Sequence, residues 1–187
     1  VLASGGDGAS GAAPDTVAFQ FAWRGAAPSR TPVAYDRQTA TINYVRGNDP
    51  SRWQQGVPTF ARVRYDEVYP GIDLVYYGNQ RRLQYDVVVS PGADPSSIAL
   101  DVHGADRVEL ASDGRLLLHA GERALEQQPP FTYQVIGGVQ VEVASRFVLD
   151  GETVRFALGE YDRSRELVID PVIAYSSWFG GSGEDGV

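Results

Sequence analysis

The 187-residue chain contains no cysteine, no methionine and no lysine. The lack of cysteine excludes disulfides and thiolate metal sites. No run approaches the roughly 18 consecutive apolar residues of a membrane-spanning helix, so no membrane span is predicted in this chain. No basic segment followed by an apolar core marks a signal peptide. Because methionine is absent, we expect the sequence to be a fragment, a processed product or the ordered part of a longer protein.

All 16 basic residues are arginine, and the formal net charge is −8. Nucleic acid is not an expected partner, since phosphate binding depends on clustered cations. The exclusive use of arginine is typical of a GC-rich genome; the alternative is selection for planar, bidentate ion-pair partners. The length, with 43% hydrophobic and 21% charged residues, indicates a globular protein of one domain or two very small ones.

Periodicity divides the chain into three parts. Residues 1–15 are rich in Gly, Ala and Ser without a repeating apolar pattern, which predicts a flexible arm. Residues 16–171 alternate apolar and polar side chains in short runs, the pattern of half-buried strands. Residues 172–187 form a separate tail. The clearest alternating runs lie at residues 17–23, 60–65, 72–77, 82–89, 139–143 and 154–158.

Turn signals separate these runs too closely for a linker. Segments 112–115, 136–139 and 150–152 each predict a two-residue hairpin turn. No apolar pattern with helical spacing persists for three turns. Asp94 followed by Pro95 predicts one helical turn before a strand at residues 100–102. The sequence therefore predicts an all-β domain over residues 16–171, mostly antiparallel and folded as a β-sandwich.

Several long segments carry a resemblance to a known family. They read YVRGNDPSRW (residues 44–53), GVPTFARV (56–63), YPGIDLVYYG (69–78) and LQYDVVVSPGADPSSI (83–98). Together they resemble the domain found ahead of the SBBP-type β-propeller repeats in large secreted bacterial surface proteins. The C-terminal segment DPVIAYSSWFGGSGED (170–185) resembles the opening strand of the first such repeat.

This resemblance implies a secreted or cell-surface location and an architecture rather than a reaction. It also implies strands ahead of Thr16 that open with an Asn-x-Gly-Gln-like segment; that segment is absent, so we expect part of the sheet to be missing. The tail would lack its propeller neighbours. It should add to the sheet of the main domain, remain loose, or complete the sheet of a second copy. The candidate residues of this assembly strand are Val172, Ile173, Tyr175, Trp178 and Phe179.

Few residues suggest catalysis, and no catalytic residue is assigned. His103 and His119 lie at the ends of predicted strands, where histidine is most often a surface residue. Ser182 lies in a Gly-rich segment that departs from a nucleophile elbow and is not followed by a helical pattern. The remaining enzymatic hypothesis is an acid pair for glycoside hydrolysis. Its candidates are Asp66, Glu67, Asp73, Asp86, Asp162 and Asp170, although 24 acidic residues make such clusters expected by chance; Asp66 and Glu67 are better explained as a solvated turn and Asp170 as a strand end.

Ligand-binding patterns are also sparse. Asp7, Glu184 and Asp185 offer oxygen ligands suited to calcium, but without the spacing of a calcium-binding loop, so we assign no metal site and no cofactor. Aromatic side chains are candidates for a polysaccharide platform; the alternative is that their rings form the sandwich core. The platform candidates are Trp53, Tyr69, Tyr76, Tyr77 and Tyr85.

The all-β pattern and the sparse catalytic candidates favour a non-enzymatic structural or interaction module, and the resemblance implies that it belongs to a secreted or cell-surface bacterial protein. The expected partners are a second copy of the chain, joined by strand exchange into an oligomer or filament, or other surface proteins. A carbohydrate-binding module is the alternative, and an acid-pair glycoside hydrolase is a further alternative.

Overall fold

A computed structural model gives the fold and describes residues 2–3, 18–27, 31–79, 82–121, 123–171 and 173–174. Strands dominate these residues, and the two helical segments are 3-10 turns of three residues each. The strand pairs are antiparallel throughout the three sheets. The predicted all-β, mostly antiparallel sandwich is therefore confirmed.

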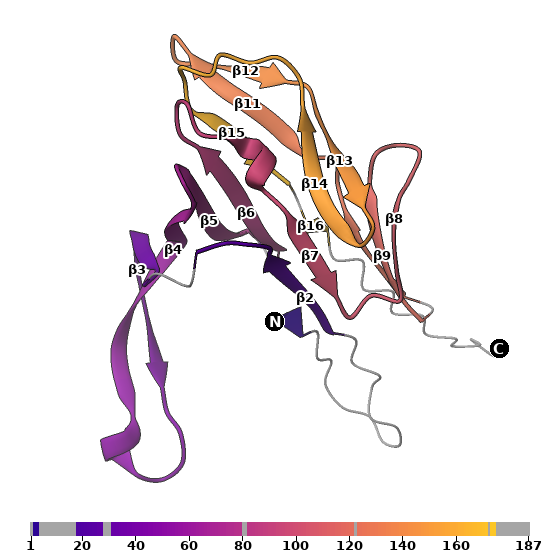
Figure 1. Ribbon diagram of the computed structural model, residues 1–187. Helices are drawn as coiled ribbons and strands as arrows, with labels where there is room; N and C mark the ends of the chain where they lie inside the picture. Colours follow the sequence, from indigo (N-terminus) through magenta and orange to yellow (C-terminus); the bar gives the residue numbers. More distant parts are fainter. Residues whose placement is uncertain are drawn as a thin grey trace, which may run out of the picture.

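The strands form one large sheet and two smaller ones (Figure 1). The seven-stranded sheet has the order β12 (Val139–Val143), β11 (Phe131–Ile136), β15 (Leu167–Asp170), β6 (Arg82–Val89), β5 (Ile72–Asn79), β4 (Gln54–Tyr69) and β3 (Val33–Tyr44). The five-stranded sheet has the order β1 (Leu2–Ala3), β2 (Ala18–Trp23), β7 (Leu100–His103), β14 (Thr153–Leu158) and β13 (Ser145–Asp150). The four-stranded sheet has the order β16 (Ile173–Ala174), β10 (Arg123–Gln127), β9 (Leu116–Ala120) and β8 (Arg107–Leu110).

One hydrophobic cluster joins all three sheets and forms the core between the layers. Successive side chains of a strand point to opposite faces, so the central strands give the core every second residue, such as Ile72 and Leu74 of β5 and Val87 and Val89 of β6. Burial of these apolar side chains is the main stabilising contribution to the fold. Core residues that are at most 2% exposed include Ile72, Val87, Leu100, Leu116, Leu118, Phe147, Val154, Leu167 and Ile169.

Two of the three predicted hairpin turns are confirmed. Ile136 pairs with Val139, so residues 137–138 alone join β11 to β12; residues 151–152 join β13 to β14 in the same way. Gly137 and Gly138 have φ values of 60° and 83°, the left-handed conformation that such a turn requires at both positions. The prediction at residues 112–115 is wrong in length, because Leu110 pairs with Leu116 and leaves a five-residue connection.

The predicted helical turn after Asp94 is confirmed as η2 (Pro95–Ser97). The Asp94 carboxylate accepts a hydrogen bond from the Ser96 backbone N–H at 3.0 Å and so satisfies a donor left free at the start of the turn. The predicted strand at residues 100–102 is β7. A matching Asp-Pro-Ser segment forms η1 (Pro50–Arg52), which the sequence analysis did not assign.

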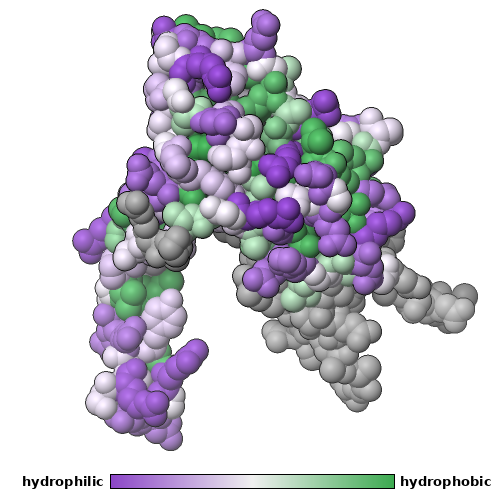
Figure 2. Space-filling model, viewed as in Figure 1, coloured by the Kyte–Doolittle hydropathy of each residue, from purple (hydrophilic) through white to green (hydrophobic). Residues whose placement is uncertain are grey.

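The strands β3 and β4 extend beyond the rest of the large sheet as a projecting hairpin (Figure 1). We call residues 37–60 the hairpin arm, because β4 pairs with β5 only from Arg62 onward. Two side chain–backbone hydrogen bonds stabilise the tip of the arm. Asn43 Oδ1 accepts from the Gly56 N–H at 2.8 Å, and Trp53 Nε1 donates to the Gly47 carbonyl at 3.2 Å. Almost all of the arm is exposed, and apolar residues lie along it (Figure 2).

Both ends of the described chain add strands to the sandwich. Leu2 and Ala3 pair with β2, and Ile173 and Ala174 pair with β10. The rest of the predicted flexible arm and of the tail lies outside the described residues. The domain boundaries at 16 and 171 stay a prediction.

Candidate functional site

The outer face of the large sheet, turned away from the core, carries a group of charged and aromatic side chains that we call the outer-face cluster. Its members come from β4, β5, β6 and β15: Arg62, Tyr77, Asp86 and Asp170. In β5 the even-numbered residues Ile72 and Leu74 pack in the core. Because side chains alternate between the two faces of a strand, Tyr77 points to the opposite face. The ladder places Tyr77 beside Arg62 in β4. Strand alternation and register therefore bring these residues together.

The Tyr77 hydroxyl is the centre of this cluster. It donates to Asp86 Oδ1 at 2.8 Å and lies 3.4 Å from Asp170 Oδ1. The Arg62 guanidinium lies over the Tyr77 ring, with its central carbon 5.2 Å from the ring centroid, a cation–π arrangement. Arg62 Nε also lies 3.3 Å from Asp36 Oδ2. One tyrosine thus links two carboxylates and a cation.

Partial burial changes the acid strength of the cluster. Burial raises the pKa of Asp86 to about 6; the charge of Asp170 adds to the rise, whereas the Tyr77 hydrogen bond and Arg62 oppose it. Burial also raises the pKa of Asp170, and the Tyr77 hydrogen bond opposes that rise. The pKa of the Tyr77 hydroxyl is raised by burial and by both carboxylates. The cluster therefore takes up a proton at a higher pH than exposed carboxylates do.

Two of the acid candidates, Asp66 and Glu67, lie in a bulge of β4, and a third, Asp73 of the neighbouring β5, contacts it. The Asp73 side chain, 6% exposed, accepts from Arg64 Nη2 at 2.5 Å and from the Glu67 backbone N–H at 2.6 Å. Arg64 Nε also pairs with Asp66 at 2.7 Å. The strand register shifts between Tyr65 and Tyr69, and Glu67 has a φ of 48°. These contacts hold the bulge, so Asp66 and Asp73 have a structural role here.

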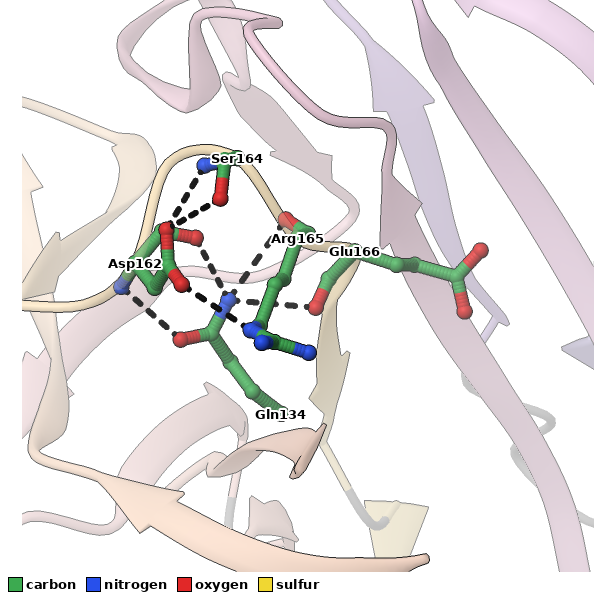
Figure 3. Close-up of polar contacts among 5 residues, drawn as sticks. All are labelled: Gln134, Asp162, Ser164, Arg165 and Glu166. Atoms are coloured by element: carbon green, nitrogen blue, oxygen red, sulfur yellow. Dashed lines mark hydrogen bonds and ion pairs between the residues drawn. The ribbon is translucent and has the colours of Figure 1, made fainter. Parts of the chain in front are cut away.

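Asp162 anchors the loop between β14 and β15 (Figure 3). Its Oδ1 accepts from the Ser164 N–H at 3.0 Å, and its Oδ2 accepts from Arg165 Nε at 2.9 Å. The buried amide of Gln134 in β11 binds the same loop: its Nε2 donates to the Asp162 and Glu166 carbonyls, and its Oε1 accepts from the Asp162 N–H. Asp162 therefore has a structural role: it holds the loop and, with Gln134, fixes it to the sheet.

The five aromatic platform candidates do not form one platform. Tyr69 and Tyr85 are 5% and 3% exposed, so a sugar cannot stack on either ring. Tyr76 also packs against the core, where its hydroxyl accepts from Trp23 Nε1 at 3.0 Å. The alternative that these rings form the core holds for these three. Trp53 lies at the end of the hairpin arm, and Tyr77 lies in the outer-face cluster.

The two histidines lie on different strands, and neither has a nucleophile as a hydrogen-bond partner among the residues that the structure describes. His103 is exposed at the end of β7. His119 in β9 lies among charged side chains, with its Nε2 3.4 Å from Glu109 Oε1 and 3.3 Å from Arg107 Nη2. Both therefore have the surroundings of surface residues.

Exposed apolar side chains gather at the two free edges of the large sheet. Among the described residues eleven large hydrophobic side chains are exposed, and all but Leu110 lie in two groups. Those at the β3 edge and hairpin arm are Val33, Ile42, Tyr44, Val45 and Phe60, and those in the edge strand β12 and its neighbour β11 are Phe131, Val135, Ile136, Val139 and Val141. The sequence analysis did not identify either group, because exposure at an edge depends on strand order.

The predicted assembly strand is described only in part. Ile173 pairs with Gln127 of β10 in the same chain, so this part of the tail adds to its own sheet, one of the outcomes expected. Val172, Tyr175, Trp178 and Phe179 lie outside the described residues.

No metal cluster or membrane helix is present in the part of the chain that the structure describes. No group of three or more His, Cys, Asp or Glu residues there is arranged to hold a metal ion. The calcium candidates Asp7, Glu184 and Asp185 lie outside that part. None of the described helices is long and apolar enough to cross a membrane.

Comparison with known proteins identifies one family. The family described as "Domain of unknown function (DUF7948)" matches residues 5–172, which include all the strands of the sandwich except β1 and β16. No curated protein and no solved structure matches the chain. Because the match covers most of its length, this chain belongs to the DUF7948 family.

Proposed function

We propose that this chain is a non-enzymatic interaction module of a secreted or cell-surface bacterial protein and that it associates with itself through a free edge of its large sheet. The observation that carries the proposal is the gathering of exposed apolar side chains at the β3 and β12 edges. The secreted location rests on the resemblance to the domain ahead of SBBP-type repeats.

Sheet edges are suited to association because they hold backbone N–H and C=O groups without a neighbouring strand. Contiguous exposed apolar side chains are a further mark of interaction surfaces. Here the two properties coincide: Val139 is 63% exposed and Val33 is 51% exposed, each in the last strand of the sheet. Pairing of either edge with another strand would satisfy the backbone groups and cover these side chains.

The outer-face cluster favours a structural role over glycoside hydrolysis. A glycosidase holds its two carboxyl groups on either side of the scissile bond. In this protein the Tyr77 hydroxyl lies between Asp86 and Asp170 and makes contact with both. The acid pair is therefore occupied by a side chain of the protein where a substrate would need to lie.

A carbohydrate-binding module is the second candidate, favoured by one observation on the outer face. Phe131 and Tyr133 in β11 lie side by side, with ring centroids 5.6 Å apart and planes at 32°. Phe131 is 43% exposed and lies directly opposite Asp170 in the ladder between β11 and β15. A glycan array tests this candidate: binding that is lost in Phe131→Ala would support it, and the lack of binding at millimolar sugar would exclude it.

Sedimentation velocity of the full chain, from micromolar to near-millimolar concentration, tests the proposed function. We expect a concentration-dependent shift from monomer to a larger species. A monomer over the whole range would contradict the proposal. Incubation with glycan, peptide and ester substrates tests the non-enzymatic part, which turnover abolished by Asp86→Asn would overturn.

A further inference from the structure

The strand β12 is a free edge without the usual protection. Of the described strands only β11 pairs with it, over five consecutive residue pairs without a register shift. It contains no proline and no arginine, and its only charge is Glu142. The opposite edge, β3, has two register shifts and a left-handed Asp36 with a φ of 57°. Bulges and charged residues hinder the pairing of β3 with a further strand, whereas β12 has no such feature.

The ladder defines which backbone groups of β12 are free. The two-residue turn makes Ile136 and Val139 a hydrogen-bonded pair. Bonded and non-bonded pairs alternate in an antiparallel ladder, so Val141 and Val143 also bond to β11. The N–H and C=O groups of Gln140 and Glu142 therefore point away from β11 and toward the open edge.

The sequence of β12 is complementary to itself. We propose that two copies of this chain pair through β12 in antiparallel orientation, with Val141 opposite Val141 of the second copy. In this register Gln140 lies opposite Glu142 of the second copy, and each pair exchanges both backbone hydrogen bonds. No like charges face each other, and an amide lies opposite each carboxylate. On the core side of the sheet, Val139 lies opposite Val143.

The register also covers the apolar side chains that the edge exposes. Val139 and Val141 are 63% and 43% exposed, although they point to the same side of β12 as Val143, which is buried in the core at 5%. In the pair, the exposed Val139 of each copy lies beside the buried Val143 of the other. The hydrophobic core of one sandwich would then continue into the next.

Strand direction selects a closed dimer over a filament. Each neighbouring pair in the seven-stranded sheet is antiparallel, so its two edge strands, β12 and β3, run in the same direction. Joining β12 of one copy to β3 of the next by translation would therefore give a parallel pair. Two β12 strands related by a two-fold axis are antiparallel, and a two-fold interface closes on itself.

Cysteine cross-linking of the full chain tests this register. Because the chain has no cysteine of its own, any disulfide must form between the introduced residues. In a non-bonded antiparallel pair the Cα atoms lie about 4.5 Å apart, within the range that a disulfide spans. V141C should therefore form a covalent dimer under mild oxidation. V139C is the matched control: it is more exposed, but its two copies would lie about 13 Å apart. Circular dichroism verifies that both variants are folded.

The proposal rests on the proposed function, and the two fail in different ways. We expect V141C to cross-link at least about tenfold faster than V139C, and a mixture of V139C with V143C to form the heterodimer. Equal cross-linking of V141C and V139C, or faster cross-linking of V139C, would overturn the register. If the unmodified chain dimerises in sedimentation while V141C does not cross-link, the register is wrong and the proposed function stands. If the unmodified chain is monomeric, both are wrong.

Discussion

Asp86→Asn should make the protein more stable at neutral pH and reduce the pH dependence of its stability. Burial raises the pKa of Asp86 from its ordinary value of 3.8 to about 6. The folded state therefore holds this proton more tightly than the unfolded state does. Stability from this group is fully present below about pH 4 and is lost as the pH rises through about 6.

The magnitude follows from the shift. Each pKa unit corresponds to about 1.36 kcal/mol, so a rise of about two units gives an upper limit of about 3 kcal/mol. The carboxylate is half-buried and Arg62 lies nearby, so solvent screening reduces the expected effect to about 1–2 kcal/mol. The asparagine carbonyl can still accept the hydrogen bond from Tyr77, so the variant removes the charge and keeps this contact.

Urea denaturation at a series of pH values from about 4 to about 8 measures the effect. Asp86→Asn should match the unmodified protein at the acid end and exceed its free energy of unfolding by about 1–2 kcal/mol above pH 7. Glu160→Gln, an exposed position in the loop after β14, is the control and should change stability by no more than about 0.5 kcal/mol. A less stable Asp86→Asn protein at pH 7.5, or an unchanged pH dependence, would refute the reasoning.

Three further substitutions test the packing and the backbone, each by urea denaturation at pH 7. Asp73→Ala removes the acceptor for Arg64 and for the Glu67 N–H and should cost about 2 kcal/mol; no loss would mean that this bulge is not held by the carboxylate. Gly104→Ala should cost about 2–3 kcal/mol, because φ is 85° and an added Cβ would lie 2.3 Å from the Ala18 carbonyl oxygen; near-neutral behaviour would contradict this close approach. Phe147→Ala removes a 2% exposed ring from the core and should cost about 3–5 kcal/mol; a cost below about 1 kcal/mol would place Phe147 outside the core.

The sequence predicts the strands well because alternation of apolar and polar residues depends only on neighbouring positions in the chain. The alternation of Ile72 and Leu74 with Asp73 and Val75 defines two faces of β5 irrespective of the rest of the chain. The turn at residues 137–138 was likewise predicted from two adjacent glycines that tolerate positive φ. The length of the connection after β8 was predicted wrongly. It is determined by the pairing of Leu110 with Leu116 and not by the Asp-Gly dipeptide within it.

The candidate site depended on contacts that no local pattern contains. Asp86 and Asp170 are joined by Tyr77 only because β15 enters the sheet beside β6, although the two aspartates are distant in sequence. Their sequence signal was a polar residue at an outward position in an otherwise apolar strand. Tyr69 and Tyr85 were candidates for a platform, but strand order placed both in the core. The open β12 edge likewise depends on which strand ends the sheet.

Sedimentation velocity on a mixture of V141K and V141E tests the central claim of self-association through β12 most directly. Each variant alone places like charges directly opposite each other across the two-fold axis and should be monomeric, whereas the equimolar mixture pairs opposite charges and should restore the dimer. Val33→Lys, a similarly exposed position on the β3 edge, is the control and should leave the dimer intact. Dimers of either variant alone, or a mixture that stays monomeric while the unmodified chain dimerises, would contradict the account.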